Sequence, residues 1–89
     1  MAQAFIKDPG AVLDYVVDWS VWLGTDTIAT STWTVGTGLT QASASNTTTM
    51  ATCWLSGGTA GQSYSATNRI VTAGGRTDER TLTITVMDK

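Results

Sequence analysis

The chain of 89 residues has no histidine and only one cysteine. Without histidine it lacks the usual general base, the imidazole of nucleophilic triads and the commonest transition-metal ligand. With Cys53 alone, no disulfide can form within the chain, so the hydrophobic core must hold the fold unaided. These absences predict that the protein is not an enzyme and requires no metal and no cofactor.

Charge and long hydrophobic runs are also scarce. A net charge of -2, with 13% charged residues, gives no basic field for nucleic acid, so we expect a protein partner. No stretch approaches the ~20 apolar residues that a membrane-spanning helix needs. The N-terminus also lacks the basic segment and apolar run of a signal peptide. We therefore expect a soluble protein that does not contact a membrane.

The remaining reactive groups favour structural roles. Cys53 lies in an expected strand with no candidate base, which indicates a buried thiol that fills the core. Asp14, Asp18 and Asp26 could approach one another and hold a hard cation. They lack the dense spacing of a calcium loop, however, so capping or solvated positions are the favoured interpretation.

The composition predicts strands. Eighteen threonines and nine glycines stand beside two lysines and one glutamate, so strong helix formers are few and a β-branched residue is abundant. The clearest strands are 62–72 and 76–87, in which apolar and polar residues alternate. The loop Ala73-Gly74-Gly75 between them predicts an antiparallel hairpin. Asn68 falls on the inner face, where it must cap a bulge or bond to backbone.

Three earlier strands are expected at 13–19, 28–35 and 49–55. In the last of these we favour Ala51, Cys53 and Leu55 as the inner face over Met50 and Trp54. Residues 41–48 have no periodicity and predict a loop or a weak edge strand. Trp22 and Leu23 are expected in a tight turn or a single helical turn.

These elements predict an all-β fold: an immunoglobulin-like antiparallel β-sandwich of six to seven strands, with Greek-key connections and no disulfide. We expect residues 1–10 to form an N-terminal arm and turn, and residues 11–89 a single domain. Tyr64 is expected to form a tyrosine corner, in which its hydroxyl bonds to backbone. Trp33 is expected at the centre of the core with either Trp19 or Trp54.

Several motifs resemble a family of small phage virion proteins of the fiber-tail adaptor type. They include Lys7-Asp-Pro9, Asp18-Trp-Ser-Val-Trp-Leu23, the segment from Trp54 to Tyr64 and the segment from Arg76 to Val86, so the resemblance covers nearly the whole chain. It implies a virion structural protein that attaches a fiber or spike to the tail. It also implies synthesis in the bacterial cytoplasm and binding to tail and fiber components in multiple copies of a symmetric assembly.

Two other functions remain open at this point. Within virion proteins, the chain could decorate the capsid or complete the head-tail junction. In a different class, it could be a carbohydrate-binding module of the host-recognition apparatus, with tryptophans stacked on sugar rings. Sugar binding needs two or three coplanar exposed aromatic side chains, and a core that buries two tryptophans leaves too few.

The candidate partner-binding residues are apolar side chains outside the expected core and the charges of the last hairpin. They are Phe5, Ile6, Trp22, Trp54, Arg76, Asp78 and Arg80. Trp22 is the first choice as an anchor, with Trp19 or Trp54 second, because tryptophan desolvates a large apolar area with few rotors. The charges could form a solvated network or a recognition patch. Removing residues 1–9, or changing Trp22 to Ala, is expected to abolish incorporation into particles without unfolding the domain.

Overall fold

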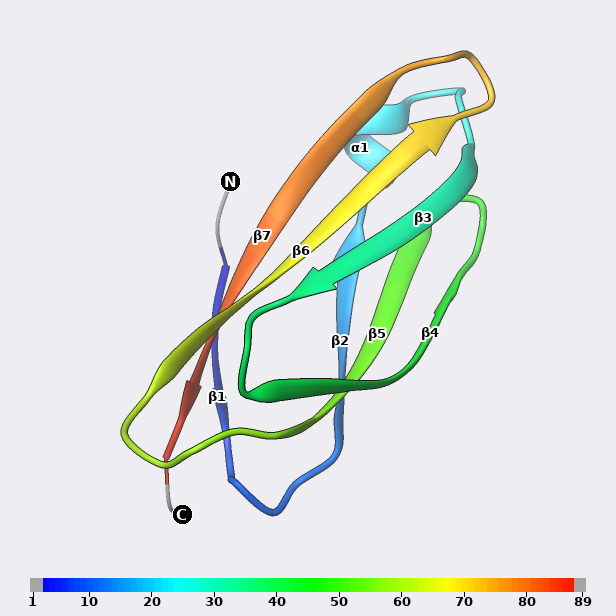
Figure 1. Cartoon of the computed structure of the whole chain (residues 1–89). Helices are drawn as coiled ribbons and strands as arrows, with labels where there is room; N and C mark the ends of the chain where they lie inside the picture. Colours follow the sequence, from blue (N-terminus) through cyan, green and yellow to red (C-terminus); the bar gives the residue numbers. More distant parts are fainter. Residues whose placement is uncertain (1–2, 88–89) are drawn as a thin grey trace.

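The computed structural model describes residues 3–87 and places seven strands and one short helix in two facing sheets (Figure 1). The elements are β1 (Gln3–Lys7), β2 (Leu13–Asp18), α1 (Ser20–Leu23), β3 (Ile28–Val35), β4 (Leu39–Asn46), β5 (Met50–Gly57), β6 (Ser63–Thr72) and β7 (Thr77–Val86). One sheet has the order β1-β7-β6-β3 and the other the order β2-β5-β4. The prediction of a β-sheet fold of six to seven strands without a disulfide is confirmed.

The predicted hairpin of the last two strands is confirmed. β6 and β7 pair antiparallel, with Ala66 opposite Leu82 and Tyr64 opposite Ile84. The turn closes when the Thr72 amide donates to the carbonyl of Arg76 at 2.8 Å. Alternation along both strands therefore directed Leu82, Ile84 and Val86 into the core, where they are buried.

The favoured inner face of β5 is also confirmed. Ala51, Cys53 and Leu55 are fully buried, whereas Met50 and Trp54 are each 40% exposed on the outer face. β5 is the central strand of its sheet, between β2 and β4. Because β5 pairs with a strand on each side, its alternate side chains are held on opposite faces of the sheet, one buried and one exposed.

The segment expected as a loop or weak edge strand is an edge strand. β4 pairs with β5, and a bulge interrupts the pairing between Gln41 and Ser43. Only Leu39 at its beginning is buried, and the rest of the strand is exposed. Backbone hydrogen bonds to β5, rather than burial, hold β4 in place, which explains why its sequence has no apolar period.

The expected N-terminal arm is part of the fold over residues 3–7. β1 pairs in parallel with β7, with Phe5 opposite Ile84 and Lys7 opposite Val86. Phe5 meets the Tyr15 ring edge to face at 5.1 Å between centroids. Lys7 is fully buried, and its ammonium donates to the carbonyls of Asp8 at 2.9 Å and Gly57 at 2.7 Å.

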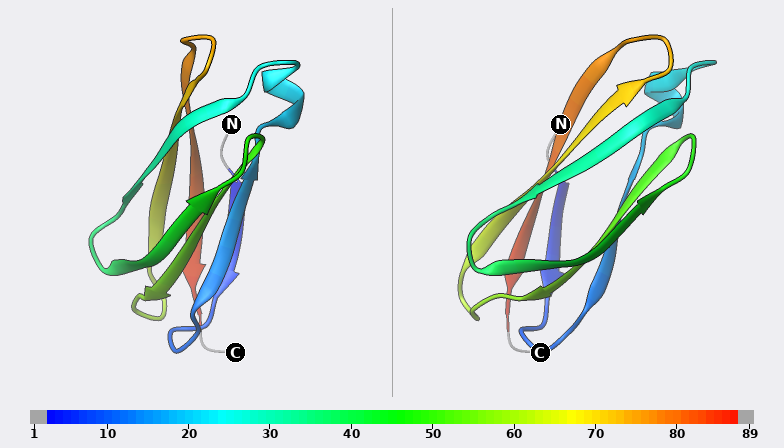
Figure 2. Two further views of the ribbon diagram at one scale, coloured as in Figure 1. Left: turned by 90° about the vertical axis from the view of Figure 1, so that its right-hand side faces the viewer. Right: turned by 45° about the vertical axis from the view of Figure 1, so that its right-hand side comes forward.

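The core lies between the two sheets, whose arrangement is seen in the views of Figure 2. Its buried apolar residues are Tyr15, Val17, Trp19, Leu23, Ile28, Leu39, Ala51, Cys53, Leu55, Ala66, Ile70, Leu82, Ile84 and Val86. Among the tryptophans, Trp19 is completely buried. Trp33 does face inward, but it is only half-buried, because β3 is an edge strand whose inner side is incompletely covered. Trp54 faces outward, so of the two alternatives Trp19 is the buried one, and Trp33 packs against the edge of the core and not at its centre.

Tyr64 ties the β5–β6 connection to the start of β6. Its hydroxyl accepts a hydrogen bond from the Thr59 amide at 2.9 Å, which is the contact to upstream backbone that the sequence predicted. Among the described residues, no helix has the length and apolar character needed to cross a membrane.

Candidate functional site

Helix α1 sits at one end of the sandwich, beside the β6–β7 turn (Figures 1 and 2). We call the surface formed by α1, residues 24–27 and the β6–β7 turn the α1 end. Asp18 is the last residue of β2, and its carboxylate accepts a hydrogen bond from the Ser20 amide at 2.9 Å, whereas Trp19 is the N-cap residue of the helix and makes no side-chain capping bond. The helix is a single turn, in which the Leu23 amide donates to the carbonyl of Trp19. Four residues make too short a helix to be stable alone, so its neighbours must hold it.

Trp19 anchors the α1 end to the interior. Its indole N–H donates to the side-chain carbonyl of Asn68 at 2.8 Å. The Asn68 amide in turn donates to the Ser31 hydroxyl at 2.9 Å and to the carbonyl of Thr32 at 3.0 Å. Asn68 is fully buried on the inner face of β6, so one satisfied polar group joins β3, β6 and the residue before α1.

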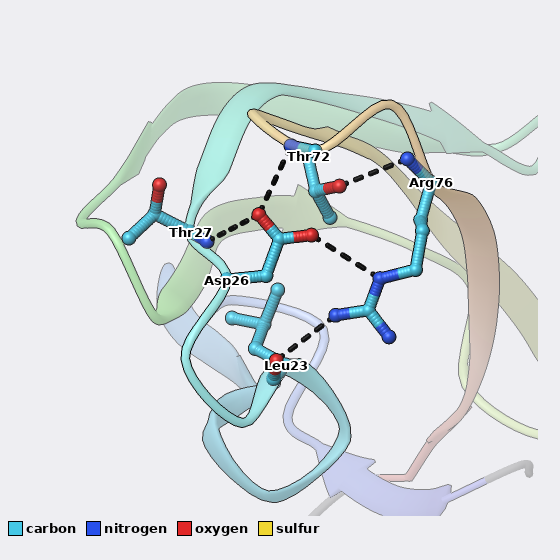
Figure 3. A network of polar contacts seen from close by, with 6 residues as sticks. Leu23, Asp26, Thr27, Thr72 and Arg76 are labelled. Atoms are coloured by element: carbon cyan, nitrogen blue, oxygen red, sulfur yellow. Dashed lines mark hydrogen bonds and ion pairs between the residues drawn. The ribbon is translucent and has the colours of Figure 1, made fainter.

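A second network surrounds Asp26 (Figure 3). One carboxylate oxygen accepts from the amides of Thr27 at 2.9 Å and Gly74 at 3.0 Å, and the other accepts from Arg76 Nε at 3.1 Å. The Arg76 guanidinium also donates to the carbonyl of Leu23 at 2.9 Å, the last residue of α1. A Cβ on Gly74 would lie 2.9 Å from Asp26, so glycine permits this close approach.

The hydrogen bonds determine the ionisation of Asp26. A bond from the Thr72 side chain, bonds from the amides of Thr27 and Gly74, and the contact with Arg76 lower the pKa of Asp26 to about 2. The carboxylate is therefore ionised at neutral pH, and it links the β6–β7 turn to the segment after α1.

This lowered pKa predicts an acid-dependent loss of stability. Since the pKa is lower in the folded chain, the contribution of Asp26 is complete above its ordinary value of 3.8 and is lost as the pH falls through about 2. Urea unfolding at several pH values should show a smaller loss across this interval for Asp26→Asn than for the unchanged protein. Asp78→Asn, at an exposed carboxylate near the same turn, is the control. Equal losses in all three proteins would contradict this role of Asp26.

Two arginines of β7 and the preceding turn cover the tryptophans. The Arg76 guanidinium lies 4.4 Å from the centroid of the Trp22 ring, and that of Arg80 lies 4.3 Å from the centroid of Trp19. The two indoles meet edge to face at 5.3 Å. Arg80 also donates to the carbonyl of Asp18 at 3.1 Å. Cation–π contacts of this kind stabilise by about 0.5–1 kcal/mol at exposed sites, so the four side chains form a well-held cluster.

The residue that this cluster presents outward is Val21. Its side chain is 96% exposed, whereas Trp22 and Leu23 of the same short helix pack against or within the core. Val21 was not among the predicted partner-binding residues. The expected single helical turn could have indicated an exposed residue here, since one turn can direct only some of its side chains inward.

The structure brings some predicted site residues together and separates others. Trp22, Arg76 and Arg80 meet at the α1 end, but Trp22 is half-buried against the core and is not a free anchor. Asp78 is exposed, and its carboxylate accepts from the Glu79 amide. The others lie elsewhere. Phe5 packs on the core, Ile6 is 54% exposed on β1 and Trp54 lies on the outer face of β5. Trp19 is excluded as an exposed anchor by its burial.

The carboxylates considered for a cation site do not converge. Asp26 is bound to Arg76 and Asp18 to the start of α1, whereas Asp14 points outward from β2. Within residues 3–87, no three acidic or cysteine side chains are grouped closely enough to hold a metal ion, and no pocket opens on the surface.

Comparison with known protein families finds a match over most of the chain. The family model described as podophage GP4 fiber-tail adaptor protein gp77 matches residues 7–85. No curated protein matches the chain. The matched segment runs from the last residue of β1 almost to the end of β7 and so includes both sheets and the α1 end. The chain therefore belongs to the gp77 family of podophage fiber-tail adaptor proteins.

Proposed function

We propose that the protein joins a fiber to the tail as a rigid, non-catalytic body, and that the α1 end is one of its two contact surfaces. Its family is that of a structural adaptor of the virion tail. An adaptor must hold each partner in a fixed orientation, which requires contact residues on a part of the fold that does not move. The observation that supports the α1 end is an almost fully exposed Val21 on a turn fixed by Arg76 and Asp26.

The scaffold is, in our proposal, an immunoglobulin-like sandwich. The order β2-β5-β4 corresponds to strands B-E-D of such domains, and β3-β6-β7 corresponds to C-F-G. The first strand differs from the constant-domain arrangement, because β1 joins β7 in the other sheet. The Tyr64 hydroxyl bond to the Thr59 amide, at the connection from β5 to β6, supports the same assignment.

We also infer that several copies act together in a symmetric assembly with tail and fiber proteins. Exposed apolar residues occur at the α1 end and, separately, on the outer face of the sheet β2-β5-β4. Two different surfaces on one small body allow each copy to contact two different neighbouring proteins.

A carbohydrate-binding function receives less support. Sugar stacking needs several exposed aromatic side chains on one face. Trp19 is buried, whereas Trp22 and Trp33 pack against the core, so Trp54 is the tryptophan most open to solvent in the described chain.

The proposed role of the α1 end can be tested at Val21. Val21→Asp places a charge in an apolar contact, and we expect a decrease of about tenfold or more in fibers attached per particle. Stability should change by no more than about 0.5 kcal/mol, because the Val21 side chain lies in solvent. The measurement is electron microscopy of particles from a phage that lacks the gene and receives the variant from a plasmid.

Val12→Asp is the matched control. Val12 is also an exposed valine, at 54%, but it lies in the β1–β2 connection at the opposite end of the molecule from α1 (Figure 1). Particles with Val12→Asp should carry normal fibers. Normal fibers with Val21→Asp would exclude the α1 end as a contact surface. Normal fibers without any adaptor would instead refute the adaptor function for this protein.

A further inference from the structure

The outer face of the sheet β2-β5-β4 carries an apolar group that the fold does not require. We call it the Trp54 face and define it by Val16, Met50 and Trp54. These side chains are 39%, 40% and 40% exposed, on the opposite side of the sheet from the buried Cys53 and Leu55. Outer positions of an antiparallel sheet are usually polar, because one face packs on the core and the other meets water.

The other sheet follows that rule. Its outer positions on β6 and β7 are mostly serine and threonine, and their hydroxyls bond across the strands. Thr67 and Thr81 lie 3.0 Å apart and Ser63 and Thr85 lie 3.1 Å apart, oxygen to oxygen. The same chain therefore builds a hydroxyl-lined face on one sheet and exposes an indole, a thioether and an isopropyl group on the other.

Strand register makes the three apolar side chains neighbours. Val16 lies opposite Thr52 on β5, so Met50 and Trp54 are its two diagonal neighbours. Diagonal positions are about 7–8 Å apart, within reach of long and aromatic side chains. The Trp54 face is therefore an apolar group that crosses from β2 to β5 along the diagonals, with Thr52 between Met50 and Trp54.

Charge on this face is one-sided. Asp14 lies opposite Trp54, and Asp18 lies opposite Met50, so both carboxylates stand on the β2 side of this group. On the other side, β4 contributes Ser43 opposite Trp54 and Ser45 opposite Thr52. The chain has no charged residue between Asp26 and Arg69, so this side is neutral. A complementary surface must be apolar in the middle and cationic along one side.

We propose that the Trp54 face binds a different virion protein, whose surface has an apolar recess for the Trp54 indole and lysine or arginine side chains opposite Asp14 and Asp18. This inference rests on the adaptor function and assigns the second of its two contact surfaces. A buried tryptophan surrounded by small polar groups that exclude water is the usual composition of an interface hot spot.

A second copy of this chain is a poor match for the Trp54 face. Among the described residues, Lys7 is buried, and Arg76 and Arg80 are stacked on Trp22 and Trp19. The remaining cation, Arg69, lies opposite Glu79, whose charge opposes its own. The described part of the chain thus offers no free cationic and apolar surface to its own copies, which favours a different protein.

The first test is Trp54→Thr, which gives this outer position the character of the other sheet. We expect the purified variant to remain folded and the number of fibers per particle to fall about tenfold or more. Val16→Thr should reduce fiber attachment in the same direction. Val71→Thr is its matched control, because it makes the same change at an outer position of β6 and should leave fibers unchanged.

Asp14→Lys tests the charge of the partner. It should weaken attachment more than Asp14→Asn, because it places like charges opposite each other. Fiber counts with Asp14→Lys equal to those of the unchanged protein would overturn the cationic part of the proposal.

The outcomes separate the alternatives. Normal fibers with both Trp54→Thr and Val16→Thr would overturn the role of the Trp54 face, while the adaptor function would stand if particles lacking the protein have no fibers. Sedimentation of the purified chains tests the other occupant. If the unchanged protein is oligomeric and Trp54→Thr is monomeric, the face binds a second copy and the proposed partner is wrong.

Discussion

Changing Trp19 to Ala should leave little folded protein. The side chain is completely buried, and replacing a core tryptophan with alanine costs about 3–5 kcal/mol. The Asn68 carbonyl would lose its donor inside the core, which adds about 1–3 kcal/mol. At about 0.05–0.15 kcal/mol per residue, a chain of this length has a total stability of roughly 4–13 kcal/mol. The expected loss is therefore comparable to the whole.

Urea unfolding followed by circular dichroism measures this effect, and Trp19→Phe separates its two parts. Phenylalanine keeps most of the ring but cannot donate to Asn68, so its cost should be intermediate. Trp54→Thr is the control for loss of an indole, since that ring lies outside the core. A loss below about 1.5 kcal/mol for Trp19→Ala would show that the cluster at the α1 end does not depend on this residue.

Deleting residues 1–9 should destabilise the sandwich by several kcal/mol, on the order of a core truncation. The deletion removes the parallel pairing of β1 with β7 and the contact of Phe5 with Tyr15. It also removes the buried Lys7 side chain, whose ammonium bonds to the carbonyl of Gly57. From the sequence we expected this truncation to leave the fold intact, and the position of β1 in the sheet reverses that expectation.

The measurement is the urea midpoint of the truncated chain, with sedimentation to detect association through the newly free edge of β7. Lys7→Met keeps much of the buried length without the ammonium and should lose only part of the stability. An unchanged midpoint for the truncated chain would show that β1 is dispensable. The arm interpretation of residues 1–10 would then be restored.

Periodicity predicted the strands whose two faces meet different surroundings. In β5 and β7 the inner residues are apolar and buried, so their alternation gave both the strand and its orientation. β1 could not be found this way, because it has five residues and its partner β7 lies at the other end of the chain. Nothing local in such a short segment distinguishes a parallel edge strand from an extended arm.

Local pattern also could not predict which tryptophan is buried most deeply. Alternation shows that Trp33 faces inward, but burial also depends on whether a strand is central or at an edge, which pairing decides. Trp19 follows β2 directly and projects into the space between the sheets, where Asn68 receives its N–H. The predicted alternative of a backbone bond for Asn68 is confirmed by its contact with the Thr32 carbonyl, but the bond from the Trp19 indole was not predicted.

The α1 end was predicted in part. Trp22, Arg76 and Arg80 were selected for their chemistry, and their proximity depends on β7 passing beside the end of β2. Asp26 could not be recognised as the partner of Arg76 from local pattern, because 50 positions separate them. Val21 was missed because exposure of an apolar residue is a tertiary property.

Burial of Cys53 has a practical consequence. The thiol lies fully inside the core, and desolvation raises its pKa to about 11, so a thiol reagent in neutral solution can reach a reactive sulfur only after the sheets separate. The rate of labelling therefore reports how often each molecule opens. Because the chain has one cysteine, every copy carries one natural labelling site that reports this opening. Slower labelling in assembled particles than in free protein would measure how strongly the neighbours in the tail hold each copy closed.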